Sequence, residues 1–181
     1  MNNKDISNQI QILLNQFNAG NFDLVISKSK VLLKKNPEYA ILYNLLGSAY
    51  QNIADYVKAK QSFKKGLQLD PNNIALMNNL AMAHKNLLEY KTAEELYLKI
   101  LKINNKYINA YINYGNLKRD INKFSESIEL YEKAFLTPRS TKFGLLCRNK
   151  FLSEWRTFHV LGVGLPVESP ATLVETNSFH G

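Results

Sequence analysis

The amino-acid sequence predicts an all-α protein built from antiparallel helix pairs that stack on one another. Three observations carry this prediction: a repeat of 34 residues, apolar spacing typical of helices within each repeat, and helix-stopping residues between repeats. The chain has 181 residues, a formal net charge of +8 and 45% hydrophobic residues. That length suits one domain, or one domain plus a short appendage.

The repeat is seen when the sequence is aligned with itself at an offset of 34 residues. One column then holds only aromatic residues: Phe22, Tyr56, Tyr90 and Phe124. A second column holds small residues: Gly47, Ala81 and Gly115. A third column holds aromatic residues: Phe63, Tyr97 and Tyr131. Chance rarely matches so many residue classes at one offset.

Within each repeat the apolar residues recur with helical spacing. One buried stripe runs through Leu42, Leu45, Leu46, Ala49 and Tyr50. A second stripe follows a short break and ends at Pro71, because proline lacks an amide donor and disfavours helix before it. We therefore expect helix pairs at 6–18 and 22–35, 40–53 and 56–69, 74–87 and 90–103, and 108–121 and 124–137.

The small residues have a steric interpretation. Where the two helices of a pair cross closely, Gly47 and Gly115 leave room for an aromatic ring on the opposite helix. A pair alone cannot bury both of its faces, so it stacks on the next pair. The aromatic stripe is therefore expected to be core and not a cofactor site.

These residues bring the sequence close to a known family. The positions that carry the resemblance are Tyr43, Leu46, Gly47, Tyr50, Ala59, Phe63 and Pro71. They resemble the tetratricopeptide repeat (TPR) pattern, which implies a right-handed α-solenoid of about four helix pairs over residues 3–138. Its repeats would lie near 6–37, 40–73, 74–107 and 108–139. The first departs from the pattern at Leu13, Val25 and Ser29, as expected of a terminal repeat with one face in water.

The resemblance also implies a concave groove lined by the first helix of each pair, a surface suited to extended ligands. The candidate binding residues are Asn44, Gln51, Asn78, Asn79, Met82, Lys85, Asn113, Asn116 and Arg119. A carboxamide offers both donors and an acceptor, as an extended peptide backbone requires. Asn79 and Asn113 are placed similarly to the asparagine ladder in the TPR arm of O-GlcNAc transferases, although Leu45 interrupts that ladder. The alternative is compositional bias on a solvated surface.

Two basic residues of this set share a column, since Lys85 and Arg119 lie 34 residues apart. They are expected to attract an acidic peptide or a C-terminal carboxylate. This arrangement is similar to the carboxylate clamp of chaperone-binding TPR proteins, although fewer basic positions match. The alternative is ordinary surface charge balanced by Asp120 and Glu89.

The composition changes from Pro138 onward. Residues 140–159 have the apolar spacing of an amphipathic helix that would cap the last repeat, and 160–181 form an irregular tail. This end of the chain is a native cap, a truncated fragment of a following domain, or an out-of-frame segment. Residues 168–180 weakly resemble the closing strands of phytanoyl-CoA-type iron/2-oxoglutarate oxygenases, which would make His180 an iron ligand. No His-x-Asp/Glu pair precedes it to complete the ligand set.

No pattern indicates catalysis or a cofactor. Glycine-rich phosphate loops are absent, and the only cysteine, Cys147, has no evident base. His84 is expected to be a packed core residue, and Glu94 to pair with neighbouring lysines on an exposed helix. The chain shows no signal peptide and no apolar run that could span a bilayer, which favours a cytoplasmic protein. Scattered lysines favour solvated helix faces over a nucleic-acid or membrane partner.

The sequence therefore predicts a non-catalytic scaffold that binds an extended peptide or a partner protein in its groove. The alternative is the substrate-recruiting arm of a larger enzyme, such as a glycosyltransferase, a sulfotransferase or an oxygenase. Self-association through the uncovered end of the solenoid is a third interpretation.

Overall fold

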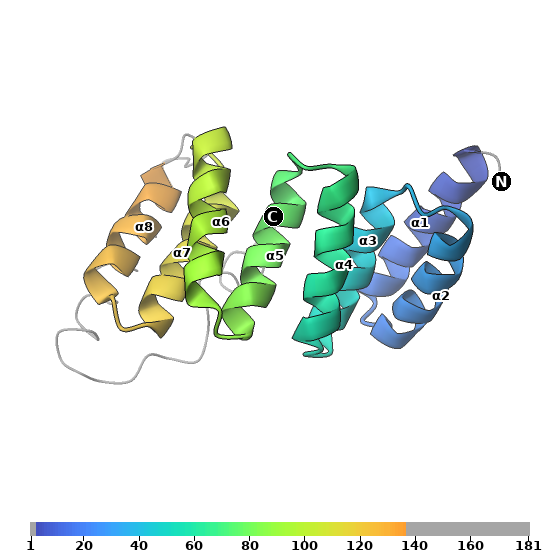
Figure 1. The fold of residues 1–181 in the computed structure, drawn as a ribbon, viewed down its shortest axis with the longest axis horizontal. Coiled ribbons are helices and arrows are strands. Elements are labelled where there is room, and N and C mark those ends of the chain that lie inside the picture. The colour runs from blue at the N-terminus through green and yellow to red at the C-terminus, as the bar shows by residue number, and fades with distance from the viewer. Residues whose placement is uncertain (1–2, 137–181) are drawn as a thin grey trace, which may run out of the picture. The chain divides into compact units, whose positions relative to one another are not determined.

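The computed structural model describes residues 3–136, which form eight α-helices in four antiparallel pairs (Figure 1). The helices are α1 (Asn3–Asn18), α2 (Phe22–Lys35), α3 (Ala40–Asn52), α4 (Tyr56–Leu69), α5 (Ile74–Asn86), α6 (Tyr90–Ile103), α7 (Ile108–Asp120) and α8 (Phe124–Leu136). The described residues contain no β-strand, and their helices end within three residues of the predicted bounds. The predicted cap and tail, with Cys147 and His180, lie outside the described residues.

All four pairs turn in the same way between their two helices. One residue of each turn has a positive φ: Gly20 (78°), Ala54 (60°), Leu88 (62°) and Asn122 (61°). The next amide then donates to the carbonyl five residues back, with N···O distances of 3.0 Å for Asn21, 2.9 Å for Asp55, 2.9 Å for Glu89 and 2.8 Å for Lys123. This bond satisfies carbonyls that the end of a helix leaves unpaired.

The small residues of the repeat lie against aromatic rings, as the sequence predicted. A Cβ atom built on Gly47 would lie 2.5 Å from Cε1 of Phe63, and one built on Gly115 would lie 2.6 Å from Cε1 of Tyr131. In the first pair the large residue lies on the first helix and the small one on the second. Leu13 stands in the column of Gly47, Ser29 stands in the column of Phe63, and both are buried. Each arrangement thus pairs one large buried side chain with one small one.

Neighbouring pairs meet mainly through one second helix and the next first helix. This contact joins α2 to α3, α4 to α5, and α6 to α7. The backbones of successive first helices also come close to one another, in the order α1, α3, α5 and α7. The backbones of α2 and α4 lie farther apart, and so do those of α4 and α6. Successive first helices therefore lie closer together than these second helices do.

The first pair presents a largely polar outer side. Its Ile12 corresponds to Leu46, Leu80 and Tyr114, which are buried against a preceding pair, but Ile12 itself is 58% exposed. Exposed amides surround it on the same helix: Asn8, Gln11 and Asn15. This end is built to face water, in agreement with the expectation of an atypical first repeat.

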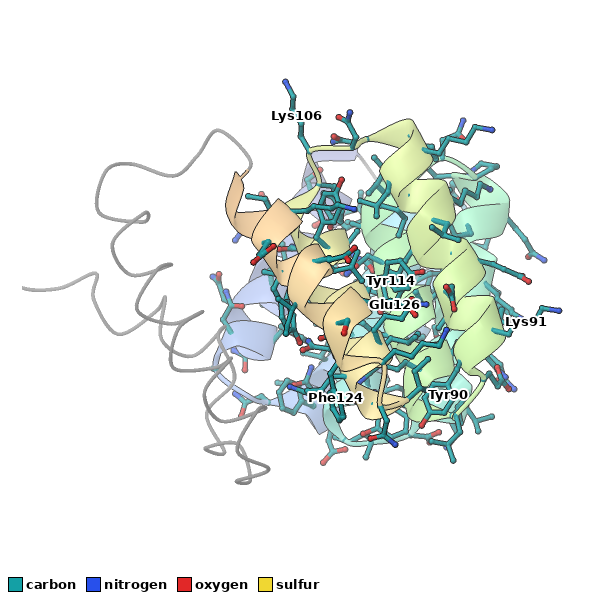
Figure 2. The ribbon with its side chains drawn as sticks, turned by 90° about the vertical axis from the view of Figure 1, so that its left-hand side faces the viewer. Tyr90, Lys91, Lys106, Tyr114, Phe124 and Glu126 are labelled. Carbon is teal, nitrogen blue, oxygen red and sulfur yellow. The ribbon has the colours of Figure 1, made fainter. Side chains whose placement is uncertain are left out.

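An ion-pair cluster around one buried lysine links the last two described pairs. Lys118 is only 3% exposed, and its Nζ lies 2.7 Å from Glu94 Oε1 and 2.7 Å from Glu126 Oε2. The hydroxyl of Tyr114 donates to Glu94 at 2.5 Å. Figure 2 shows Tyr114 and Glu126 in the region between α6 and α8, while Lys91 points outwards. The expected surface pairing of Glu94 is therefore wrong, because this carboxylate binds the next repeat.

His84 occupies the column of Lys118 one repeat earlier. It is buried, as predicted, and its Nδ1 contacts Oε2 of Glu89. The other carboxylate oxygen of Glu89 lies 2.7 Å from Nζ of Lys60, on the preceding pair. Burial lowers the pKa of His84, although Glu89 opposes that effect. Charged contacts thus join both of these repeat boundaries.

The first prediction concerns the contact between glycine and aromatic ring. Gly47→Ala should destabilise the protein by about 1–3 kcal/mol, because the new methyl group overlaps the ring of Phe63 and forces both helices to shift. Chemical denaturation measures the change. Ser48→Ala, at the next residue of α3, is the control and should have little effect. Equal stability of Gly47→Ala and the unsubstituted protein would contradict this account of the packing.

The second prediction concerns acid stability. Burial alone would raise the pKa of Glu94, but hydrogen bonds from Lys118 and Tyr114 outweigh it and lower that pKa below the usual 4.5. Folded protein therefore takes up this proton at lower pH than the unfolded chain. The stabilisation is present above pH 4.5 and is lost as pH falls through the folded pKa.

Glu94→Gln should accordingly flatten the acid limb of the stability profile, measured by urea denaturation between about pH 5 and pH 3. Glu95→Gln, on the exposed side of α6, is the matched control and should leave the slope as it is. If both variants changed the pH dependence of stability equally, the cluster around Lys118 would have no special part in acid unfolding.

Candidate functional site

The candidate site is the surface of the first helices that faces away from the second helices, here called the first-helix surface. The structure places every predicted binding residue on α3, α5 or α7: Asn44 and Gln51 on α3, Asn78, Asn79, Met82 and Lys85 on α5, and Asn113, Asn116 and Arg119 on α7. All are half-buried except Asn78, which is buried. Side chains with this exposure are held in place by neighbours and still reach the surface.

The asparagines of this surface bind one another across the repeats. Asn79 Nδ2 donates to Asn44 Oδ1 at 2.9 Å, and Asn113 Nδ2 donates to Asn78 Oδ1 at 3.0 Å. Both bonds join residues 35 apart, on successive first helices. The sulfur of Met82 lies 3.3 Å from Asn113 Nδ2. The predicted ladder therefore exists as lateral pairs that tie α3 to α5 and α5 to α7.

These lateral bonds do not exhaust the carboxamides. Each carboxamide has two donor hydrogens and an oxygen that accepts two hydrogen bonds, so the single mutual bond of Asn44 and Asn79 leaves both of them capacity for another partner. Asn78 and Asn113 also direct their amide nitrogens to the sulfur of Met82, and Asn78 is buried, so the oxygen of Asn113 is the group that this pair leaves for a ligand. The paired side chains are also oriented by each other, which reduces the entropy that a ligand would have to remove. The surface can thus bind a backbone with side chains that are already ordered.

The two basic candidates come together through Asp120, the acidic neighbour that the sequence indicates as the alternative partner of their charge. Lys85 Nζ lies 2.7 Å from Asp120 Oδ2, and Arg119 Nη2 lies 3.2 Å from Asp120 Oδ1. Asp120 comes 35 residues after Lys85, the same offset that joins the asparagine pairs. Glu89, the other acidic residue indicated with it, pairs instead with Lys60 and His84.

Two other candidates behave differently. Asn116 is directed towards the second helix of its own pair, where Oδ1 accepts a hydrogen bond from the hydroxyl of Tyr131 at 2.6 Å. Gln51 Oε1 is buried and has no hydrogen-bond partner among the described residues. Gln51 Oε1 is therefore out of reach of a ligand in this conformation, and Asn116 Oδ1 already accepts from Tyr131.

A buried hydroxyl lies behind this surface. Tyr97 corresponds to Tyr131 one repeat earlier, but Met82 stands where Asn116 would accept its hydrogen bond, and the described residues offer the hydroxyl no partner. Burial raises the pKa of Tyr97, and the negative charge of Asp120 raises it further.

The described residues offer binding groups and no evident centre for metal chemistry. They contain no group of three histidine, cysteine or acidic side chains that could hold a metal ion. None of the described helices is long and apolar enough to cross a membrane. The arrangement provides hydrogen-bonding carboxamides along α3, α5 and α7 and a small charged cluster where α5 and α7 end.

Solved structures with the same fold are found among TPR proteins. A thermophilic TPR protein of Thermus thermophilus superposes with a TM-score of 0.68 at 17% identity, over 79% of this chain and 78% of that one. A MamA crystal structure gives 0.61 at 24% identity, over 77% and 85% of the two chains. The first TPR of Spaghetti (RPAP3), bound to the HSP90 peptide SRMEEVD, gives 0.53 at 24% identity, over 65% and 93%. A search of curated protein sequences finds no match.

A family model gives the more direct comparison. The tetratricopeptide repeat model matches residues 40–73, 74–107 and 108–136, which hold the helices from α3 to α8. The pair α1 and α2 has the same turn, lies outside the matched residues, and departs from the pattern at Leu13, Val25 and Ser29. Since the matched repeats cover more than half of the chain, this protein belongs to the tetratricopeptide repeat family.

Proposed function

We propose that this chain is a non-catalytic scaffold that holds an extended segment of a partner protein on its first-helix surface. The observation that carries the proposal is the row of asparagine pairs, Asn44 with Asn79 and Asn78 with Asn113, which repeats across three successive first helices. Two TPR domains of similar fold, the first and second of Spaghetti (RPAP3), are bound to an HSP90 peptide. They support a peptide as the ligand class.

The chemistry of the asparagines suits an extended backbone. A peptide without secondary structure has amides and carbonyls that need partners when they leave water. The remaining hydrogens and lone pairs of the paired carboxamides would supply these partners, whatever the side chains of the ligand. In this respect the proposed mode is similar to the asparagine ladder of the O-GlcNAc transferase arm, with the difference that the asparagines here also brace one another.

The partner in this proposal is a protein, and the location is cytoplasmic. The exposed lysines of α2 and α4 are then solvated helix faces. The alternative, a recruiting arm of a larger enzyme, is not favoured by any contact among the described residues. It stays a prediction about sequence beyond this chain.

The third prediction tests the asparagine pairs. A random-peptide display library selected on the full chain supplies a ligand, whose affinity is then measured by calorimetry. Asn79→Ala with Asn113→Ala should weaken that peptide by about 1–3 kcal/mol, because its buried amides lose their partners.

The matched control is Asn72→Ala with Asn105→Ala, since these exposed asparagines lie between helix pairs and away from the first-helix surface. Circular dichroism and thermal unfolding establish that both double variants remain folded. Unchanged affinity in the first variant would remove the asparagine pairs from the binding site. A library that yields no ligand for the folded protein would overturn the proposed function.

A further inference from the structure

We propose that Asp120 is a built-in competitor for the charged part of the first-helix surface, and that the partner segment which displaces it is acidic. This inference rests on the proposed function, because it concerns the ligand and the regulation of the same surface. It goes beyond that function by naming the chemistry of the ligand and the residue that opposes its binding.

The first step is the distribution of charge over the first helices. α3 carries no charged side chain, and the charged residues of α5 and α7 all lie in their last turns. Of these, Lys118 is buried and pairs with Glu94 and Glu126 in the other cluster. The charges left on the first-helix surface of these helices are Lys85, Arg119 and Asp120.

The second step is the position of Asp120 on its own helix. It is the last residue of α7, where the unpaired carbonyls of the helix end carry partial negative charge. A carboxylate is unfavourable there, whereas Lys85 and Arg119 suit the ends of α5 and α7. The contacts of Asp120 with these two cations, at 2.7 Å and 3.2 Å, are what offsets its unfavourable place.

The third step is the strength of these contacts. The side chains of Lys85, Asp120 and Arg119 are 20%, 30% and 31% exposed, so solvent screens their attraction. Ion pairs with this exposure contribute at most about 1 kcal/mol each. A ligand carboxylate can therefore exchange with Asp120, since it offers the same two oxygens to the same ammonium and guanidinium groups.

The exchange is favoured by the balance of charge. Two cations face one carboxylate, so the cluster keeps one unit of positive charge while Asp120 is in place. An aspartate, a glutamate or a C-terminal carboxylate of the partner would pair with Lys85 or Arg119. Asp120 would then stay paired with the remaining cation. The asparagine pairs towards α3 would bind the uncharged remainder of the segment.

The experiment compares two synthetic heptapeptides on the full-length chain by fluorescence polarisation. One peptide carries three glutamates and a free C-terminal carboxylate, and the other carries glutamines and a C-terminal amide. Asp120→Asn keeps the shape of the side chain and removes its charge. It should bind the acidic peptide about fivefold or more tightly than the unsubstituted protein, with no change for the neutral peptide.

Asp55→Asn is the control for net charge, because Asp55 pairs with Lys58 at the start of α4 and away from the first-helix surface. It should leave the affinity for the acidic peptide unchanged. Adding Lys85→Gln and Arg119→Gln to Asp120→Asn should abolish the gain. Thermal unfolding of each variant shows that the fold is intact.

The inference fails if Asp120→Asn binds the acidic peptide no more tightly than the unsubstituted protein, or if Asp55→Asn gives the same gain. It also fails if the gain survives the loss of both cations. In each case a library-selected peptide that still binds the unsubstituted chain, and that loses affinity with Asn79→Ala and Asn113→Ala, leaves the proposed function standing. Absence of both kinds of binding removes the function together with the inference.

Discussion

The crossing of two helices around a residue without a side chain determines how this protein is built. Phe63 and Tyr131 occupy the space that a Cβ would take on Gly47 and Gly115. The two helices of these pairs can then approach closely, and each pair packs against the next. Each second helix contacts the following first helix, and the first helices are brought near one another. The asparagine pairs depend on that proximity, since a carboxamide reaches only a short distance from its backbone.

The periodicity of the sequence predicts the helices, their pairing and the steric partners, because these follow from contacts inside one repeat. The exchange of Leu13 and Ser29 illustrates the limit of pattern matching. The first repeat loses the small and aromatic residues of its columns, yet both replacements are buried and the turn at Gly20 is unchanged. Placing the large residue on the first helix and the small one on the second thus keeps a similar total side-chain volume in the pair.

The contacts between repeats are where sequence reasoning falls short. Helical spacing places Asn79 and Glu94 on the correct helix, but it does not say which side chain of the neighbouring repeat each one meets. Asn79 binds Asn44, and Glu94 binds Lys118. These partners depend on the rise and rotation from one pair to the next, which the sequence does not display directly. The pairing of Lys85 and Arg119 with Asp120, by contrast, is the charge balance that the sequence already indicated.

The unequal spacing of the two helix layers has a mechanical consequence. The first helices α1, α3, α5 and α7 lie in contact, and α3, α5 and α7 are cross-linked by polar side chains, whereas α2, α4 and α6 lie farther apart. The second helices are joined across repeats by charged side chains: Lys60 on α4 pairs with Glu89 at the start of α6, and Lys118 pairs with Glu94 and Glu126. Bending the stack would therefore strain packed and hydrogen-bonded helices on one side and partly exposed ion pairs on the other. The more closely packed side, which carries the candidate site, is expected to be the stiffer one.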